Sequence, residues 1–292
     1  MPILDFPVLR ASPVMLRQFL RRDAGVSAAL LTKLKALPDG ITVGGIQRRV
    51  TEPVSPGETV RLQWSEQCTA PPNPALSVPV AAETADYAVF DKPAAMPVHP
   101  SMLHRGDTLA NAFAARYPDC GFHAVNRLDR NTSGLCLTAK HIYAAARLSG
   151  QTEKRYYALL PHGLTGSGTV DAPIARETAS VITRCVRADG QRSVTHYRIL
   201  AEFPACTLAE LIPETGRTHQ IRVHMAHLGY PLLGDALYGG DCSLLSAHAL
   251  HCGFLRFPDP RSGRATELHS PLRADMAALC PTVISPEGVH LT

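Results

Sequence analysis

The sequence lacks the short motifs that mark several common cofactors. Its eight cysteines include no Cys-x-x-Cys pair and match no usual zinc spacing. It contains no phosphate-binding loop and no Rossmann glycine pattern. No apolar run reaches the roughly 18 residues that a membrane span needs. We therefore expect no metal, no cofactor and no membrane association, with free thiols in a reducing cytoplasm.

Charge of either sign is also modest. Charged residues make up 18% of the chain and the formal net charge is +4. Nucleic-acid binding depends on clustered rather than total charge, so this balance permits an RNA partner without predicting one. The N-terminus lacks the sustained apolar segment of a secretory signal, which favours a cytoplasmic protein. The 292 residues suggest about two domains, in a chain that we expect to be a monomer.

Residues 1–68 are predicted to form a small module. Ser27 is placed to cap a helix whose apolar stripe includes Leu30 and Leu34. A shorter helix is predicted before it, and residues 41–50 are predicted to form a hairpin. The module contains nine Lys or Arg against six Asp or Glu, so most of the net charge lies in this part of the chain.

The remainder of the chain is predicted to be one α+β domain. Residues 69–80 are rich in proline and indicate a stiff linker before a domain over residues 81–292. Strand and helix patterns do not alternate regularly, which favours a largely antiparallel sheet over a doubly wound fold. Strands are expected over 155–160, 195–200 and 207–212, and helices over 107–117, 141–148 and 218–229, with Asp107 and Thr218 as N-caps.

The most informative segment is residues 123–135. It places Asp129 between Arg127 and Arg130, ahead of a Thr-Ser-Gly turn and an alternating segment. Neighbouring positive charge favours the ionised carboxylate, and a strand-to-turn junction can present it to a cleft. Exposed ion pairs are common and weak, so the pattern alone favours a surface salt bridge.

The segment resembles the signature of RluA-type RNA pseudouridine synthases, His-Arg-Leu-Asp-x-x-Thr-Ser-Gly. Asn126 stands where that family usually has histidine, which leaves the aspartate and the turn intact. Ala95 likewise replaces the usual glycine of a second motif. Further stretches resemble the family in the expected order: Phe90 to Pro100, Lys154-Arg-Tyr156-Tyr-Ala158, Thr215 to His224, and Gly234-Asp235-x-x-Tyr238-Gly239. Together they cover about residues 83–275.

The resemblance implies an isomerase that converts uridine in RNA to pseudouridine. Asp129 would be the catalytic carboxylate, Arg222 its charge partner, and Tyr156 the residue that stacks on uracil or moves a proton. Strand alternation points Tyr157 to the opposite face. The resemblance also implies an alpha-L RNA-binding module for residues 1–68, with ordinary packing as the other interpretation. Ribosomal and transfer RNA are both expected partners.

Six further residues are expected to contact RNA or shape the pocket. Ile221 would form an apolar wall, and Arg127 would contact phosphate or fill the space of an extruded base. Lys92 and His99 could equally be structural. The other three expected contact residues are Arg217, His219 and His99.

Two other functions compete with the isomerase. A non-catalytic RNA-binding protein on the same scaffold would be expected to lack Asp129, Tyr156 or Arg222, and all three are present. A glycoside or nucleoside hydrolase would use paired carboxylates, and no second carboxylate accompanies Asp129 in its motif.

Overall fold

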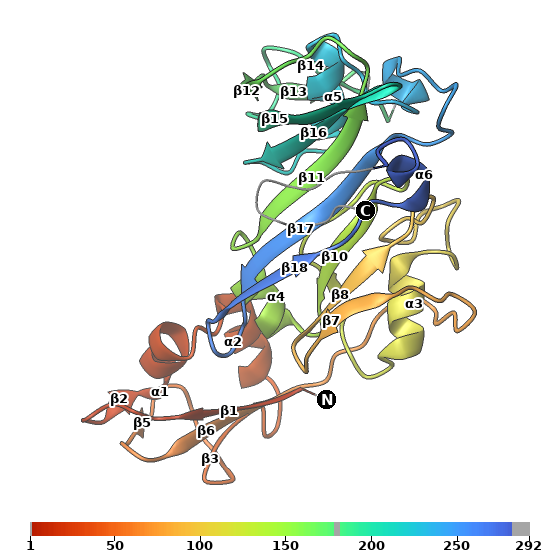
Figure 1. Ribbon diagram of the computed structural model, residues 1–292. Coiled ribbons are helices and arrows are strands. Elements are labelled where there is room, and N and C mark those ends of the chain that lie inside the picture. Colours follow the sequence, from red (N-terminus) through yellow and green to blue (C-terminus); the bar gives the residue numbers. More distant parts are fainter. Residues whose placement is uncertain (1, 178–181, 282–292) are drawn as a thin grey trace.

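A small N-terminal part and a larger sheet domain make up the fold (Figure 1). The computed structural model describes residues 2–177 and 182–281. Residues 178–181 and 282–292 of the predicted second domain lie outside the described residues. The α+β class with a mainly antiparallel sheet is confirmed.

The N-terminal part has its own sheet and hydrophobic core. Its apolar cluster includes Leu30, Leu34, Val60 and Trp64. Ser27 caps α2 as predicted, because its side chain accepts a hydrogen bond from the amide of Leu30 at 3.2 Å. The sheet has the order β1-β6-β3-β4, beside the pair β2-β5. The elements are β1 (Ile3–Pro7), β2 (Val14–Met15), α1 (Leu16–Gln18), the π-helical turn η1 (Phe19–Asp23), α2 (Ala28–Lys35), β3 (Ile41–Val43), β4 (Ile46–Gln47), β5 (Pro53–Val54) and β6 (Thr59–Gln63).

The larger sheet follows the order β12-β15-β16-β11-β17-β10-β8-β7, with β18 beside β17 and β9 beside β10. Among the described strands, β10 and β17 are parallel, whereas every other pairing in this sheet is antiparallel. The strands are β7 (Val80–Glu83), β8 (Tyr87–Lys92), β9 (His123–Ala124), β10 (Ser133–Ala139), β11 (Glu153–Leu160), β12 (Ser167–Asp171), β15 (Val194–Phe203), β16 (Cys206–Pro213), β17 (Leu250–Pro258) and β18 (Ala265–His269).

Short helices and one separate hairpin accompany this sheet (Figure 1). The helix before residue 117 begins after Thr108, whose capping box with Asn111 replaces the predicted Asp107 cap. The remaining elements are α3 (Leu109–Arg116), α4 (Ile142–Leu148), β13 (Ile174–Arg176), β14 (Arg184–Val186), α5 (Gln220–His227), the 3₁₀ turn η2 (Ala236–Tyr238) and α6 (Ala274–Ala277).

The proline-rich segment is fastened along α3. The backbone amide of Asn73 donates to the carbonyl of Asn111 at 3.1 Å. The side-chain amide of Asn111 donates to the carbonyl of Pro71 at 2.7 Å. The segment therefore follows a fixed path over the domain that follows it, with a turn at residues 73–76.

Tyr143 of α4 is shared between the two parts of the protein. Its ring belongs to the hydrophobic cluster of the N-terminal part and lies 5.7 Å from the ring of Phe6. Its hydroxyl donates to the carbonyl of Ala24 at 2.9 Å. The two parts consequently share buried surface at α4.

Glu66 ties the same junction together. Its carboxylate lies 2.5 Å from His123 Nε2, and it accepts hydrogen bonds from Trp64 Nε1 at 3.0 Å and the amide of Ile142 at 3.1 Å. Burial alone would raise the pKa of Glu66, but the hydrogen bonds from His123, Trp64 and Ile142 outweigh it and lower that pKa to about 2. The junction thus depends on an ionised carboxylate.

We expect Glu66→Gln to lower the free energy of unfolding by about 1–3 kcal/mol at pH 7, because hydrogen bonds to a charged, largely buried acceptor are weakened. A carboxyl group whose pKa falls on folding stabilises the protein at pH values above its unfolded pKa, which is near 4.5 for Glu66. This stabilisation is lost as the pH falls from 4.5 toward 2. Denaturant unfolding from pH 7 to pH 3 should therefore show the gap between wild type and variant shrinking. Glu202→Gln, at an exposed position, is the control, and a pH-independent gap would contradict the assignment.

Candidate active site

A cavity of about 410 Å³ opens between the loop that precedes β10, strand β11 and the start of α5. A volume of this size suits a small organic group such as a nucleotide base and sugar. Eight of the nine residues expected from sequence line it: Asp129, Tyr156, Arg222, Arg127, Ile221, Arg217, His219 and His99.

Arg222 is held between two carboxylates. Its Nε and Nη2 donate to the two oxygens of Asp235, each at 2.7 Å, and its Nη1 donates to Asp129 Oδ2 at 3.3 Å. Burial alone would lower the pKa of Arg222, but the hydrogen bonds to Asp235 outweigh it and the net shift is upward. The guanidinium therefore stays charged, and Asp235 fixes the plane in which it meets Asp129.

His219 completes this charged group. Its Nε2 lies 3.9 Å from Asp129 Oδ2 and its Nδ1 lies 2.9 Å from the hydroxyl of Tyr238. Its backbone is left-handed, with φ at 58°, which costs a non-glycine residue about 1–2 kcal/mol. Burial lowers its pKa, with Asp129 acting in the opposite direction. His219 therefore lies beside the Asp129 carboxylate. This position is more buried than a residue that contacts the RNA backbone, as predicted from sequence, would require.

The helix after His219 begins differently from the prediction. The sequence predicts Thr218 as the N-cap, but His219 occupies that position and makes no side-chain capping bond. Gln220 secures the preceding loop instead. Its Oε1 accepts from the hydroxyl of Thr215 at 2.7 Å and the amide of Arg217 at 3.0 Å. The loop is thus fixed by a residue inside the helix.

The loop that carries Asp129 is held from behind by buried polar groups. Arg273 Nη1 donates to the carbonyl of Asn131 at 3.2 Å, and the hydroxyl of Thr132 lies 2.9 Å from His248 Nε2. At Gly134, with φ at 100°, a Cβ atom would lie 2.3 Å from the carbonyl oxygen of Cys252. Ser133 and Gly134, predicted to lie in a turn, are the first residues of β10, and position 134 needs glycine so that β10 can approach β17.

Lys92 does not reach the cavity. It is fully buried, and its ammonium donates to the carbonyls of Pro93, Met96 and Arg130 at 2.8, 2.7 and 3.1 Å. Burial lowers its pKa to about 8. Three carbonyl partners use its three protons, so the geometry supports the structural alternative for Lys92 over substrate contact.

Tyr156 and Ile221 belong to the apolar part of the cavity. Burial raises the pKa of the Tyr156 phenol well above its usual range, so the phenol is neutral. Tyr157 lies in the hydrophobic cluster on the other face of the sheet, as strand alternation requires. Lys154, two residues before Tyr156, also lines the cavity.

The mouth of the cavity is cationic. Arg127 and Arg217 are exposed there, and Arg217 Nε donates to the carbonyl of Arg192 at 3.3 Å. Burial lowers the pKa of His99, with Arg127 contributing. These side chains are placed to meet an anionic ligand.

Asn126 and Ala95, which replace the usual residues of the family motifs, differ in their structural surroundings. Asn126 is buried and bonded to β10, with its amide group donating to the carbonyl of Leu135 at 3.0 Å and accepting from the amide of Leu137 at 2.7 Å. Ala95 is left-handed, with φ at 64°, a conformation that favours glycine. Asn126 therefore supports the loop from behind, whereas Ala95 retains a strained backbone.

The residues that sequence reasoning left without a role are Asp235, Tyr238, His248 and Gln220. Asp235 and Tyr238 lie in the stretch Gly234 to Gly239, so a signal was present. His248 and Gln220 act through contacts that no local pattern reveals. Within residues 2–177 and 182–281, no three His, Cys, Asp or Glu side chains converge as metal ligands, and no helix is long and apolar enough to cross a membrane.

We expect Asp235→Asn to lower the free energy of unfolding by about 3 kcal/mol, because removing one partner leaves the buried guanidinium poorly compensated. Denaturant unfolding measures the change. Asp189→Asn is the matched control, since the Asp189 side chain is 69% exposed. Equal stability of the two variants would show that Asp235 does not hold Arg222.

Comparison with known proteins identifies the family. Residues 86–227 match the family model described as RNA pseudouridylate synthase. An uncharacterized RNA pseudouridine synthase, YjbO of Bacillus subtilis, is 37% identical over 269 residues, which cover 88% of this chain and 95% of that protein. The ribosomal large subunit pseudouridine synthase D of Xanthomonas campestris is 37% identical over 84% of this chain and 80% of its own.

A solved structure agrees with these relatives. Human RNA pseudouridylate synthase domain containing 1 superimposes with a TM-score of 0.56 at 27% identity, over 67% of this chain and 83% of that chain. Together with the cavity around Asp129, these matches show that the chain belongs to the RluA-type RNA pseudouridine synthases.

Proposed function

We propose that Asp129 is the catalytic carboxylate with which this synthase isomerises specific uridines in structured RNA. One observation carries the proposal: Arg222 Nη1 lies 3.3 Å from Asp129 Oδ2 inside the cavity that Tyr156 and the exposed arginines line. A carboxylate that accepts a hydrogen bond from a fixed cation is held in one orientation, as a nucleophile or base must be.

The reaction breaks the bond from ribose carbon 1′ to the base nitrogen and forms a bond from the same carbon to carbon 5 of the base. The proton on carbon 5 is lost and the released nitrogen gains one, so no outside group is consumed. Asp129 acts either by attacking the sugar carbon or by removing a sugar proton. Arg222 stabilises the ionised carboxylate in both routes.

The other cavity residues bind and orient the nucleotide. Tyr156 stacks on the uracil or moves a proton, and Ile221 forms the apolar wall. Arg127 and Arg217 contact RNA phosphates, or Arg127 fills the space left by the extruded base. His99 borders the mouth beside Arg127.

We propose ribosomal RNA or transfer RNA as the substrate. The name of the Xanthomonas relative, a ribosomal large subunit pseudouridine synthase, favours ribosomal RNA. We also propose that the protein acts as a monomer and, because ribosomal and transfer RNA are its proposed substrates, that it works in the cytoplasm. The alternative, a non-catalytic RNA-binding protein on this scaffold, is disfavoured because Asp129, Tyr156 and Arg222 meet in one cavity.

Asp129→Asn is expected to abolish pseudouridine formation while RNA affinity and stability stay near wild type, since phosphate contacts supply most of the affinity. Nucleoside analysis of unmodified ribosomal and transfer RNA transcripts after incubation measures the product. Asp119→Asn, which changes a carboxylate that does not line the cavity, is the control. Substantial turnover by Asp129→Asn would overturn its catalytic role.

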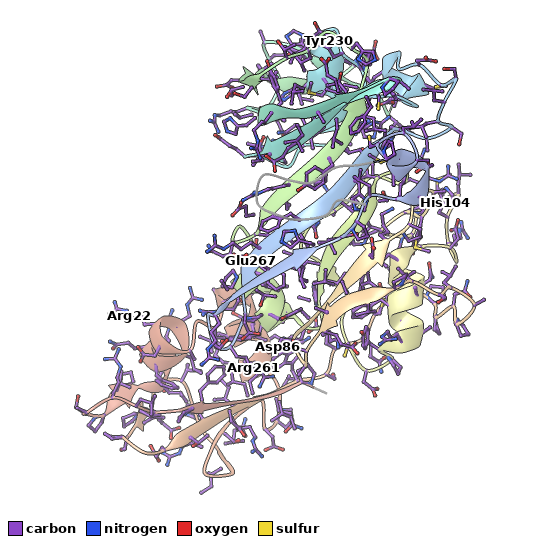
Figure 2. The ribbon with its side chains drawn as sticks, viewed as in Figure 1. Arg22, Asp86, His104, Tyr230, Arg261 and Glu267 are labelled. Atoms are coloured by element: carbon purple, nitrogen blue, oxygen red, sulfur yellow. The ribbon has the colours of Figure 1, made fainter. Side chains whose placement is uncertain are left out.

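We also propose that residues 1–68 bind RNA. Arg10, Arg48 and Arg61 are paired with carboxylates. Arg17, Arg22 and Lys35 are exposed, and among the described residues none of them has a carboxylate at salt-bridge distance. Figure 2 shows Arg22 at the outer surface of this part. These free cations suit a phosphate backbone.

Changing Arg17, Arg22 and Lys35 together to glutamine should weaken RNA binding and flatten its salt dependence. Removing one cation from a phosphate reduces the slope of log affinity against log salt by about 0.7–0.9. Arg61→Gln, which removes a cation already paired with Asp5, should change the slope less. Unchanged slopes for the triple variant would indicate that this part only packs. Because Tyr143 shares its core, substitution is a cleaner test than deleting residues 1–68.

A further inference from the structure

A tight turn close to the cavity displays two large apolar side chains to solvent. Met102 is 86% exposed and Leu103 is 89% exposed. They occupy the two central positions of a turn that is closed by backbone hydrogen bonds between Ser101 and His104, at 2.8 and 3.2 Å. Single exposed apolar residues are ordinary, but an adjacent pair at the tip of a closed turn forms a small apolar projection.

The base of this turn is fixed. His104 Nδ1 lies 2.6 Å from Asp107 Oδ2. The side chain of Asn111 donates to the carbonyl of Arg105 at 3.1 Å, and Asn73 donates to the carbonyl of Gly106 at 2.7 Å. Helix α3 and the proline-rich segment therefore hold the turn, and Figure 2 shows His104 at the outer edge of the molecule.

The turn follows directly from the cavity wall. Val98 and His99 line the cavity, and the three residues from His99 to Met102 span at most about 10 Å. The hydrogen bond from His104 lowers the pKa of Asp107, and the charge of Arg130, another wall residue, contributes. The apolar tip is thus a continuation of the cavity rim.

Cationic side chains lie on this turn and on the cavity wall. Arg105, Arg127 and Arg130 are exposed on the turn and on the neighbouring wall. An apolar tip between cations matches a nucleic acid, whose phosphates lie outside and whose stacked bases lie inside.

We propose that Met102 and Leu103 form a wedge that inserts into the RNA base stack beside the target uridine while that uridine occupies the cavity. This inference rests on the proposed function. A uridine in folded RNA leaves a gap when it is extruded, and Met and Leu are among the side chains that proteins insert between bases to unstack them. The wedge keeps the stack open, so it acts in base extrusion and leaves the bond-breaking step unaffected.

The test compares one target uridine in two settings. The wild-type enzyme first identifies that uridine in unmodified ribosomal and transfer RNA transcripts. The uridine is then placed in its folded fragment and in an unpaired oligonucleotide with the same flanking sequence. Met102→Ser with Leu103→Ser should lower kcat/KM on the folded fragment by about tenfold, a change of about 1.4 kcal/mol, and leave the oligonucleotide unaffected. Leu244→Ser, at an exposed apolar position (48%) that does not line the cavity, is the control.

A second measurement follows the extrusion of the target base directly. In the Asp129→Asn background, 2-aminopurine placed next to the target should brighten when the folded fragment binds, and the double substitution should reduce this rise. An equal rise with and without the wedge, or an equal loss of kcat/KM on both RNAs, would overturn the proposal. A change in oligomeric state without a kinetic change would instead assign the tip to protein contact. If the wild type modifies no transcript, the proposed function fails first, before the wedge is tested.

Discussion

The arrangement of this synthase depends on one guanidinium shared by two carboxylates. Arg222 gives two hydrogen bonds of 2.7 Å to the buried Asp235 and a third, of 3.3 Å, to Asp129. The difference in length separates two tasks, because the short bidentate pair through Nε and Nη2 fixes the cation and leaves Nη1 for the carboxylate at the cavity. The α5 helix and the 3₁₀ turn η2 therefore act on Asp129 through a single side chain.

The central sheet positions the loop that carries Asp129. β10 lies in parallel beside β17 and starts immediately after the loop of Asp129. Gly134 permits that close approach, while Lys92 and Arg273 hold the carbonyls of Arg130 and Asn131. Largely buried cations therefore support the loop from behind, and exposed cations line the cavity in front of it. The same residue types serve opposite purposes according to burial alone.

Features that follow from local patterns could be predicted from sequence, whereas roles that depend on burial in the folded chain could not. Alternation gave the strand of Tyr156, and the Ser27 cap and the helix after His141 follow from local patterns. The pairing of Arg222 with Asp129 needed the family resemblance, since the two residues are far apart in the chain. The role of Lys92 could not be assigned from sequence, because the motif is the same whether the ammonium binds backbone carbonyls or an RNA phosphate. The prediction that Thr218 caps the helix is wrong. Gln220, inside the helix, makes the hydrogen bonds that hold the preceding loop.

The central claim is that the Arg222 guanidinium acts on Asp129 and does not merely stabilise the fold. Arg222→Lys keeps the charge but lacks the planar fork that Asp235 and Asp129 share. The decisive measurement is single-turnover pseudouridine formation by Arg222→Lys and Arg222→Met, together with the RNA dissociation constant and the free energy of unfolding. We predict a large loss of rate for Met, a partial recovery for Lys, and RNA affinity near wild type in both. Wild-type rates for Arg222→Met in a folded protein would contradict the claim.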